Sequence, residues 1–223
     1  MKMCACLFTV KPYLIGDDLI NIVVKKGQVI KYDIKYGGEP EPEVVWQIDD
    51  KDIKEDEDRI TIDKYEKNTV LTIRKTVRSD SGKYKLILTN SSGTCEKTAD
   101  VVVLGKPGSP MGPLVAEEVR ADHVTVKWNK PNDFGGTDLT GYVLEKMDLD
   151  TGRWVAAGEV GPDKNSFKVE GLTPKKKYKF RVKAVNKEGE SEPLETEEAI
   201  VAKNPYGAAP FSCRNRAFLN FSA

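Results

Sequence analysis

The chain has 223 residues, enough for two domains of about 100 residues each. Its 35 basic and 35 acidic residues are interspersed and give a formal net charge of zero, so no block of one sign indicates binding to nucleic acid or to anionic lipid. No apolar run approaches the roughly 18 residues that a membrane-spanning helix needs. We therefore expect neither a nucleic-acid nor a membrane partner.

The N-terminal segment MKMCACLFTVKP leaves two interpretations open. One lysine followed by eight apolar or small residues is at the lower limit for a signal-peptide core, so secretion stays the alternative to an intracellular chain. The four cysteines fit neither a disulfide framework nor a zinc site built from C-x2-C pairs, and the C-x-C pair at the N-terminus is a weak metal signal. We expect free thiols in a reducing compartment at Cys4, Cys6, Cys95 and Cys213.

Strand-like runs rich in Val, Ile, Thr and Tyr fill the first half of the chain, separated by turn residues. Because side chains alternate between the two faces of a strand, the period-2 pattern predicts which residues point into the core. The stretch TNSSGT reads as a hairpin turn in which Asn90 and Gly93 suit positive φ, and the run 100–104 closes the sheet. The predicted inward residues are Ile30, Tyr32, Ile34, Tyr36, Val44, Trp46, Ile48, Leu71, Ile73, Tyr84, Leu86 and Leu88.

Two motifs in this half carry a family resemblance: G-x-P-x-P-x-V-x-W from Gly38 to Trp46, and D-S-G-x-Y from Asp80 to Tyr84. Together they resemble the intermediate-set immunoglobulin fold. The resemblance places the two positions of the usual disulfide at Ile34 and Leu86, so the bridge is absent and aliphatic side chains fill its space. It also implies that Tyr84 occupies the tyrosine-corner position, where its hydroxyl bonds backbone upstream.

The sharpest change in composition is LGKPGSPMGP, residues 104–113, where prolines and glycines prevent a central strand from continuing. We place the domain boundary there, with a short linker that restricts interdomain motion. In the second half, GLTPKKKYKFRVKAVNKEGESEP closely resembles a fibronectin type III domain. The predicted inward residues are Val124, Val126, Trp128, Tyr142, Leu144, Phe180, Val182 and Ala184. Leu172 and Tyr178 are the predicted corner residues, and Trp154 follows a turn at Thr151–Gly152.

The predicted fold class is thus all-β, with two tandem sandwiches, immunoglobulin-like then fibronectin type III-like. We expect the first domain at residues 11–104 and the second at 110–203, with irregular termini at 1–10 and 204–223. The order of the modules, the missing bridge and the phrase PxxxGG at Pro131–Gly136 resemble the giant sarcomeric proteins of the twitchin, projectin and titin group, above all the invertebrate twitchin type. Phe134 departs from that pattern, because the family usually has an acidic residue there.

No constellation of residues predicts catalysis. His123 is the only histidine and reads as a turn residue rather than a general base, and no phosphate-binding or protein kinase motif is present. The acidic stretch 49–59 lacks the spacing of a calcium loop and reads as a solvated turn. Lys175, Lys176 and Lys177 form a basic corner that reads as another solvated turn, with an acidic partner as the alternative. We expect no catalytic, cofactor or metal site and no small-molecule substrate.

The two N-glycosylation patterns, at Asn90 and Asn220, matter only in the secretory pathway and read as chance. An exposed strand edge in either sandwich could pair with another β partner. The tail 211–223, with Phe211, Phe218, Leu219 and Phe221, does not resemble a following module, and we expect it to be disordered.

The resemblance implies a non-enzymatic, cytoplasmic segment of the sarcomere that acts as spacer and docking module for thick-filament components, with myosin-filament proteins as partners and no cofactor. Two alternatives remain. An extracellular adhesion or receptor fragment shares the module types but normally keeps the disulfide that Ile34 and Leu86 replace. A regulatory segment of a giant twitchin-type kinase would carry no catalytic part in this chain.

Overall fold

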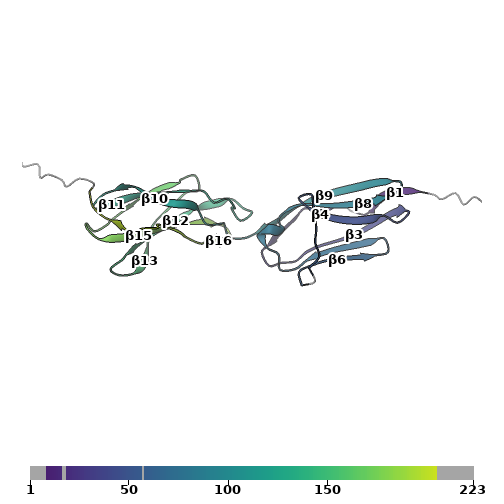
Figure 1. Cartoon of the computed structure of the whole chain (residues 1–223), viewed down its shortest axis with the longest axis horizontal. Helices are drawn as coiled ribbons and strands as arrows, with labels where there is room; N and C mark the ends of the chain where they lie inside the picture. Colours follow the sequence, from purple (N-terminus) through teal and green to yellow (C-terminus); the bar gives the residue numbers. More distant parts are fainter. Residues whose placement is uncertain (1–8, 17–18, 57, 205–223) are drawn as a thin grey trace, which may run out of the picture. The chain divides into compact units, whose positions relative to one another are not determined.

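The computed structural model describes residues 9–16, 19–56 and 58–204. The chain folds into two compact units. Each is built around a sandwich of two β-sheets whose strands are mainly antiparallel (Figure 1). Most of the segments predicted to be irregular, together with the predicted disordered tail, lie outside the described residues. Val10, the last residue of the N-terminal irregular segment, already belongs to a strand.

The first sheet of the first sandwich has the strand order β1-β3-β7-β6. Its long central strand β3 forms because Ile30, Tyr32 and Tyr36 alternate with exposed charged residues, so that one face is buried. The strands of this sheet are β1 (Val10–Ile15), β3 (Ile30–Glu39), β7 (Asn68–Ile73) and β6 (Ile60–Tyr65).

The second sheet of this sandwich has the order β2-β9-β8-β4-β5. Here β2 runs parallel to β9, whereas β9, β8 and β4 form an antiparallel ladder. A short 3-10 helix, η1 (Arg78–Asp80), leads into β8. The strands are β2 (Ile22–Lys25), β9 (Gly93–Leu104), β8 (Gly82–Asn90), β4 (Glu43–Ile48) and β5 (Lys51–Asp52).

The second sandwich pairs a small sheet, β10-β11-β14, with a larger one, β13-β12-β15-β16, in which β17 and β18 also pair with β15. Each small-sheet strand is antiparallel to its neighbour. The small sheet holds β10 (Met111–Val119), β11 (His123–Asn129) and β14 (Ser166–Glu170). The larger holds β13 (Arg153–Val160), β12 (Leu139–Asp148), β15 (Lys177–Asn186), β16 (Gly189–Glu190), β17 (Leu194–Glu195) and β18 (Ile200–Val201).

The two cores confirm nearly all of the predicted inward residues. Every one of those in the second sandwich is buried, and in the first only Ile34 and Ile48 are no more than half-buried. In the first core Trp46 stacks on Tyr32, with ring centroids 5.7 Å apart. In the second, Trp128 meets Tyr142 edge to face at 5.2 Å. Alternation therefore located both cores without a template.

The hairpin between β8 and β9 differs from the prediction at Asn90. Gly93 has the expected positive φ of 144°, but Asn90 is not among the residues with positive φ and ends β8 instead. Its side chain does the work of the turn: Oδ1 accepts the Ser92 N–H at 2.9 Å, and Nδ2 donates to the carbonyls of Val10 and Pro40. Asn90 therefore stabilises the turn through its side-chain amide and not by adopting a left-handed backbone conformation.

Candidate functional site

The two positions of the missing disulfide differ in burial. Leu86 is only 1 % exposed and pairs with Trp46 across the β4–β8 ladder. Ile34 lies on the same face of β3 as Tyr32 but is half-buried and packs at the margin of the core. The prediction that aliphatic side chains occupy these positions therefore holds fully for Leu86 and in part for Ile34.

The tyrosine corner of the first sandwich is present and is reinforced by an ion pair. The Tyr84 hydroxyl donates to the Asp80 carbonyl at 2.8 Å, and burial, followed by the nearby Asp80 charge, raises the pKa of Tyr84. Asp80 is 4 % exposed. Its carboxylate accepts the Arg59 guanidinium at 2.7 and 2.9 Å and the Val77 N–H at 2.7 Å, which satisfies a charge that would otherwise be costly to bury.

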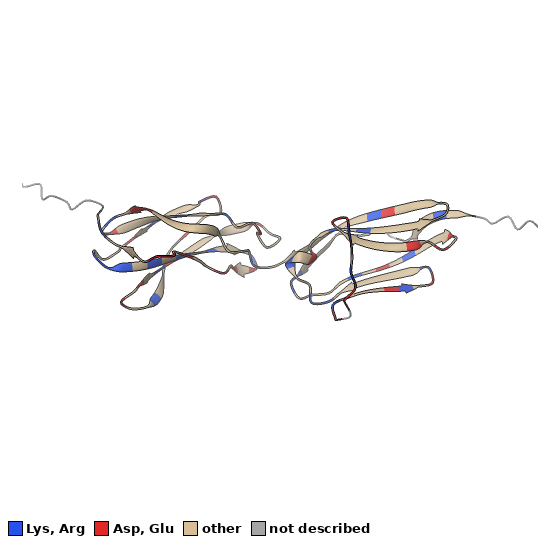
Figure 2. Ribbon diagram, in the orientation of Figure 1, with Lys and Arg blue, Asp and Glu red and all other residues tan. Residues whose placement is uncertain are grey.

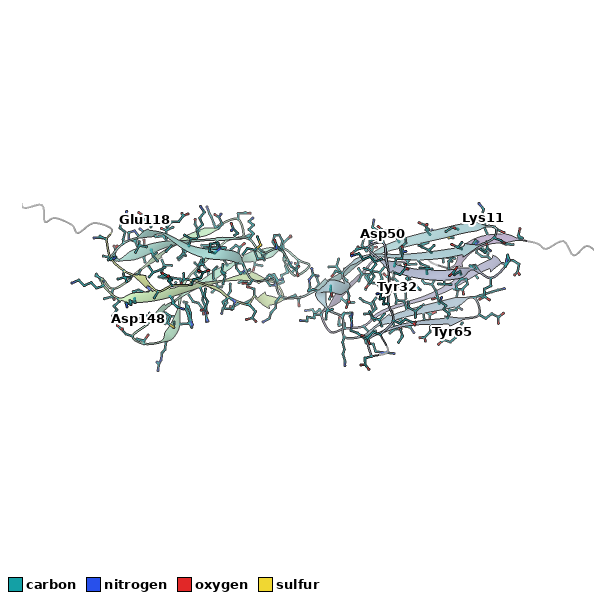
Figure 3. The ribbon with its side chains drawn as sticks, in the orientation of Figure 1. Lys11, Tyr32, Asp50, Tyr65, Glu118 and Asp148 are labelled. Carbon is teal, nitrogen blue, oxygen red and sulfur yellow. The ribbon has the colours of Figure 1, made fainter. Side chains whose placement is uncertain are left out.

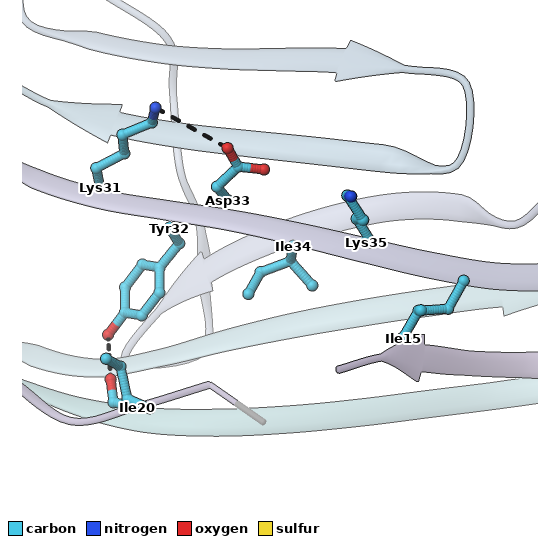
Figure 4. Close-up of a pocket in the computed structure, with 7 residues that line it drawn as sticks. All are labelled: Ile15, Ile20, Lys31, Tyr32, Asp33, Ile34 and Lys35. Carbon is cyan, nitrogen blue, oxygen red and sulfur yellow. Dashed lines mark hydrogen bonds and ion pairs between the residues drawn. The ribbon is translucent and has the colours of Figure 1, made fainter. Parts of the chain in front are cut away.

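A shallow groove of about 410 Å³ lies beside Ile34 (Figure 4). Tyr32 reaches into its base, where its hydroxyl donates to the Ile20 carbonyl at 2.9 Å, and burial raises the Tyr32 pKa to about 12. The exposed side chains of Ile15 and Ile20 lie on the same side of β3 as Tyr32, whereas Lys31 and Asp33, which form an ion pair of 3.9 Å, point to its other side. The groove offers apolar contact but no nucleophile or acid–base pair.

His123 is the first residue of β11 and pairs with Glu170 on β14, so it lies in a strand and not in the preceding turn as predicted. Its Nδ1 lies 2.7 Å from an Asp122 carboxylate oxygen, and this contact holds the pKa of that carboxyl below its ordinary value. The neighbouring Asp122 carbonyl accepts the Leu172 N–H, so the segment ties two loops together.

The acidic stretch 49–59 forms the turn between β4 and β6 but is more structured than predicted, because it contains β5 and a bridge between Asp56 and Ile60. Asp49 and Asp50 adopt positive φ. Asp49 accepts the Lys83 N–H at 2.9 Å and Asp50 pairs with Lys85. Within residues 9–16, 19–56 and 58–204, no group of three potential ligands could hold a metal ion. The carboxylates are used to hold the turn.

The predicted basic corner divides into three different environments. Lys175 takes a positive φ of 69° and its N–H donates to the Ala202 carbonyl. Lys176 pairs with Asp148, at the end of β12 (Figure 3), and with Asp150 at 2.6 and 3.3 Å. Lys177 begins β15. The three lysines therefore do not form one basic site.

The remaining sequence motifs are divided between described and undescribed parts of the chain. Cys95 is a free, half-buried thiol on β9 that packs at the edge of the core. The Asn90 amide is occupied by the hairpin contacts described above. Cys4, Cys6, Cys213 and the pattern at Asn220 lie outside the described residues. Phe134 is 42 % exposed.

The sequence pattern did not predict a cluster of charged and aromatic side chains on the outer face of the second sandwich. The Arg181 guanidinium lies over the Trp154 ring, 4.3 Å from its centroid, and its Nε donates to Glu145 at 2.5 Å. Lys183 reaches the same carboxylate at 3.3 Å, and the two cations, Arg181 first, hold the Glu145 pKa below its ordinary value. The signal was available in the alternation KYKFRVK, which places Lys179, Arg181 and Lys183 on one face, but the partner strand could not be known.

Charged residues of both signs are distributed over each sandwich (Figure 2). None of the helices within the described ranges is long and apolar enough to cross a bilayer. Neither unit brings the side chains of a catalytic or cofactor site together at any of the positions considered above.

Comparison with known proteins agrees with both halves of this description. An immunoglobulin I-set domain model matches residues 15–103, and a fibronectin type III domain model matches residues 108–197. Over 204 residues the chain is 32% identical to titin of Drosophila melanogaster. The aligned region covers 90% of the chain but only 1% of that titin. It is also 33% identical over 185 residues to the titin homolog of Caenorhabditis elegans, with 82% of the chain and 1% of that protein covered. The chain thus carries an immunoglobulin I-set domain followed by a fibronectin type III domain, and it resembles the titin-like sarcomeric proteins.

A smaller titin-like relative is myosin-binding protein H of Gallus gallus, with 31% identity over 166 residues, 74% of the chain and 30% of that protein. The chain spans between 1% and 30% of the length of these three relatives. The resemblance to the twitchin, projectin and titin group and the all-β tandem fold are both confirmed.

Proposed function

We propose that this chain is a non-enzymatic segment of the muscle cytoplasm, in which the two sandwiches act as a spacer and as a docking module for proteins of the thick filament. The observation that carries the spacer role is that the chain enters each sandwich at one end and leaves it at the other. Such modules can be joined in series without doubling back, and each adds its own length.

In the first sandwich, entry and exit lie at opposite ends of β9. The Val10 carbonyl accepts the Asn90 side-chain amide at 2.8 Å, which places entry at the β8–β9 hairpin. The chain leaves at Leu104, which pairs with Lys25 at the far end of β9. Because β9 has 12 residues and a strand rises about 3.3 Å per residue, entry and exit are separated by roughly 35 Å along it.

The second sandwich repeats this arrangement along β11. Met111 pairs with Asn129 at the end of that strand. The chain leaves beside the start of β11, where the Asn204 side chain accepts the Ala121 N–H at 3.1 Å. A stretching force applied at entry and exit therefore acts along the strands, and many hydrogen bonds of the ladder bear this force together.

The docking role is supported by two further points. The core of the first sandwich closes around Leu86 without a disulfide, which suits a reducing cytoplasm. The relative from Gallus gallus is named for binding myosin. We extend that property to this chain as part of the proposal, with myosin filaments as the partner to test.

Co-sedimentation provides the test. Purified chain is mixed with myosin filaments, with actin filaments and with buffer alone, and the pelleted fraction is measured across chain concentrations. We expect saturable pelleting with myosin filaments only. Equal pelleting with actin, or none with myosin, would contradict the docking role, whereas the spacer role is tested separately by stretching the single chain and counting two sequential unfolding events.

A further inference from the structure

The strand β15 carries a row of cations on the outer face of the larger sheet in the second sandwich. Buried residues alternate with Lys177, Lys179, Arg181 and Lys183 along the strand, because successive side chains point to opposite faces. The Cα atoms of neighbouring residues in the row are therefore about 7 Å apart. This spacing on a rigid strand fixes the row in place.

Two of these cations are held in position by the cluster around Trp154. Arg181 stacks on the Trp154 ring at 4.3 Å and binds Glu145, and its Nη1 lies 3.9 Å from Glu195 on β17. Lys183 shares Glu145 at 3.3 Å. The Arg181 side chain is only 20% exposed. The guanidinium and the indole thus form a preorganised, partly desolvated surface.

The other two cations have no such partner. Among the described residues, neither Lys177 nor Lys179 has an ion pair or side-chain hydrogen bond. Lys177 is exposed and Lys179 half-buried. The Leu149 N–H donates to the Lys177 carbonyl at 3.0 Å, so the antiparallel register places Met147 across from Lys179. Met147 in turn pairs with Trp154. Two lysines without carboxylates therefore border an apolar strip of Met147 and Trp154.

We propose that this Trp154 face, made of Met147, Trp154, Lys177, Lys179 and Arg181, docks an acidic segment of a partner protein. Carboxylates of the partner pair with the two lysines, and an apolar side chain covers Met147 and Trp154. Aromatic, methionine and arginine side chains are those enriched in protein interfaces. This inference rests on the proposed docking function and names the surface that performs it.

A protein segment fits this face better than a nucleic acid or a lipid headgroup layer. Glu145 lies beside Arg181 and Lys183 at one end of the row and would repel an unbroken line of phosphates, whereas discrete carboxylates can be placed beside Lys177 and Lys179 alone. Direct phosphate contact would instead favour a patch of one sign. The charge pattern of the face therefore selects an acidic protein.

The first test repeats the co-sedimentation with a double charge reversal, Lys177→Glu with Lys179→Glu. A matched control reverses two lysines on the outer face of the smaller sheet, Lys127→Glu with Lys168→Glu, whose side chains are 49% and 50% exposed. We expect the first variant to weaken binding to myosin filaments about tenfold, which corresponds to about 1.4 kcal/mol, and the control to bind like the parent.

The outcomes separate the two proposals. If the parent does not pellet with myosin, the proposed thick-filament docking is wrong, and the face is judged by the peptide experiment below. If the parent pellets and both variants pellet equally well, docking stands and the Trp154 face is the wrong surface. A control that weakens as much as the test variant would show an effect of net charge alone and would overturn the assignment.

The second test does not depend on myosin. A synthetic peptide of 16 residues, with glutamates flanking leucines, is titrated into the isotopically labelled full chain. We expect saturable shifts of the Trp154 indole N–H and of β12, β13 and β15 amides, lost in the Lys177→Glu, Lys179→Glu variant and reduced in Trp154→Ala. Shifts centred elsewhere, or no saturation at millimolar peptide, overturn the proposal. The proposal is also overturned if this face binds single-stranded DNA or phosphatidylserine vesicles more tightly than it binds the peptide.

Discussion

The two sandwiches solve the same packing problem with different uses of charge. Each core is built around one tryptophan and a neighbouring tyrosine, Trp46 with Tyr32 and Trp128 with Tyr142. The first sandwich places a charged pair at its tyrosine corner, where Arg59 binds the buried Asp80. At the second corner the Tyr178 hydroxyl bonds a backbone N–H instead, and the ion-pair cluster around Glu145 lies on the outer face of a sheet. The comparison shows that the first sandwich uses a buried carboxylate to hold its tyrosine corner, whereas the second carries a partly buried ion-pair cluster on the outer face of a sheet.

The tyrosine corners themselves show this contrast. In the first sandwich the Tyr84 hydroxyl is a donor to the carbonyl of Asp80, whose side chain also holds Arg59 and Val77. In the second the Tyr178 hydroxyl accepts the Thr173 N–H at 3.0 Å. A defect at the first corner should therefore spread through more bonds than a defect at the second.

The largest expected effect comes from Asp80→Ala. This change leaves the partly buried Arg59 charge without its carboxylate and the Val77 N–H without its acceptor, so we expect a loss of about 3 kcal/mol or more. Denaturant unfolding of the full chain, followed by amide resonances of each sandwich, checks it. The matched control is Asp63→Ala at an exposed position of β6, with an expected change within about 0.5 kcal/mol. A loss in the second sandwich rather than the first would contradict the local assignment.

The next largest effect distinguishes the two disulfide positions. Leu86→Ala opens a cavity beside Trp46 and should cost about 2 to 5 kcal/mol. Ile34→Ala should cost clearly less, about 1 to 2 kcal/mol, because Ile34 is only half-buried. Since neither position carries a thiol, reductant should leave the unfolding midpoint unchanged. Equal losses for the two variants would show that Ile34 is as important to the core as Leu86.

A smaller effect compares the two corners directly. Tyr84→Phe removes a donor from a fully buried bond and should cost about 1.5 kcal/mol, whereas Tyr178→Phe should cost about 1 kcal/mol because its bond is only part-buried. Both are measured by the same residue-resolved unfolding experiment. The reverse order would indicate that the ion pair at the first corner compensates for the lost hydroxyl.

The smallest effect concerns pH and the second sandwich. Arg181, and then Lys183, hold the Glu145 pKa below its ordinary value of 4.5. A carboxyl whose pKa is lowered on folding stabilises the fold above its unfolded pKa, and that contribution is lost as pH falls through the folded pKa. We therefore expect the second sandwich of Glu145→Gln to lose less stability than the parent when the pH is lowered from neutral to below 4.5. Identical pH profiles would show that the cluster contributes no linkage.

Alternation and short motifs were enough to predict the fold class and the two cores. Buried strands with one solvent-facing side have to alternate, and residues such as Trp46, Leu86, Trp128 and Phe180 show that alternation directly in the sequence. The turn at Gly93 was also predictable from local sequence, because glycine tolerates a positive φ. The family resemblance added the identity of the missing bridge and the tyrosine corner.

Contacts between distant strands were decided only by the tertiary structure. The Arg59–Asp80 pair joins residues 21 positions apart, and the Glu145–Arg181 pair joins residues 36 positions apart, and nothing local indicates either partner. Asn90 took an extended backbone because its amide found acceptors on Val10 and Pro40. The sequence alone determined which side chains leave water, because burial follows a period within one strand. Which charges meet, and so which face is left to bind a partner, depends on strand register, and register is set by the packing of the whole sandwich.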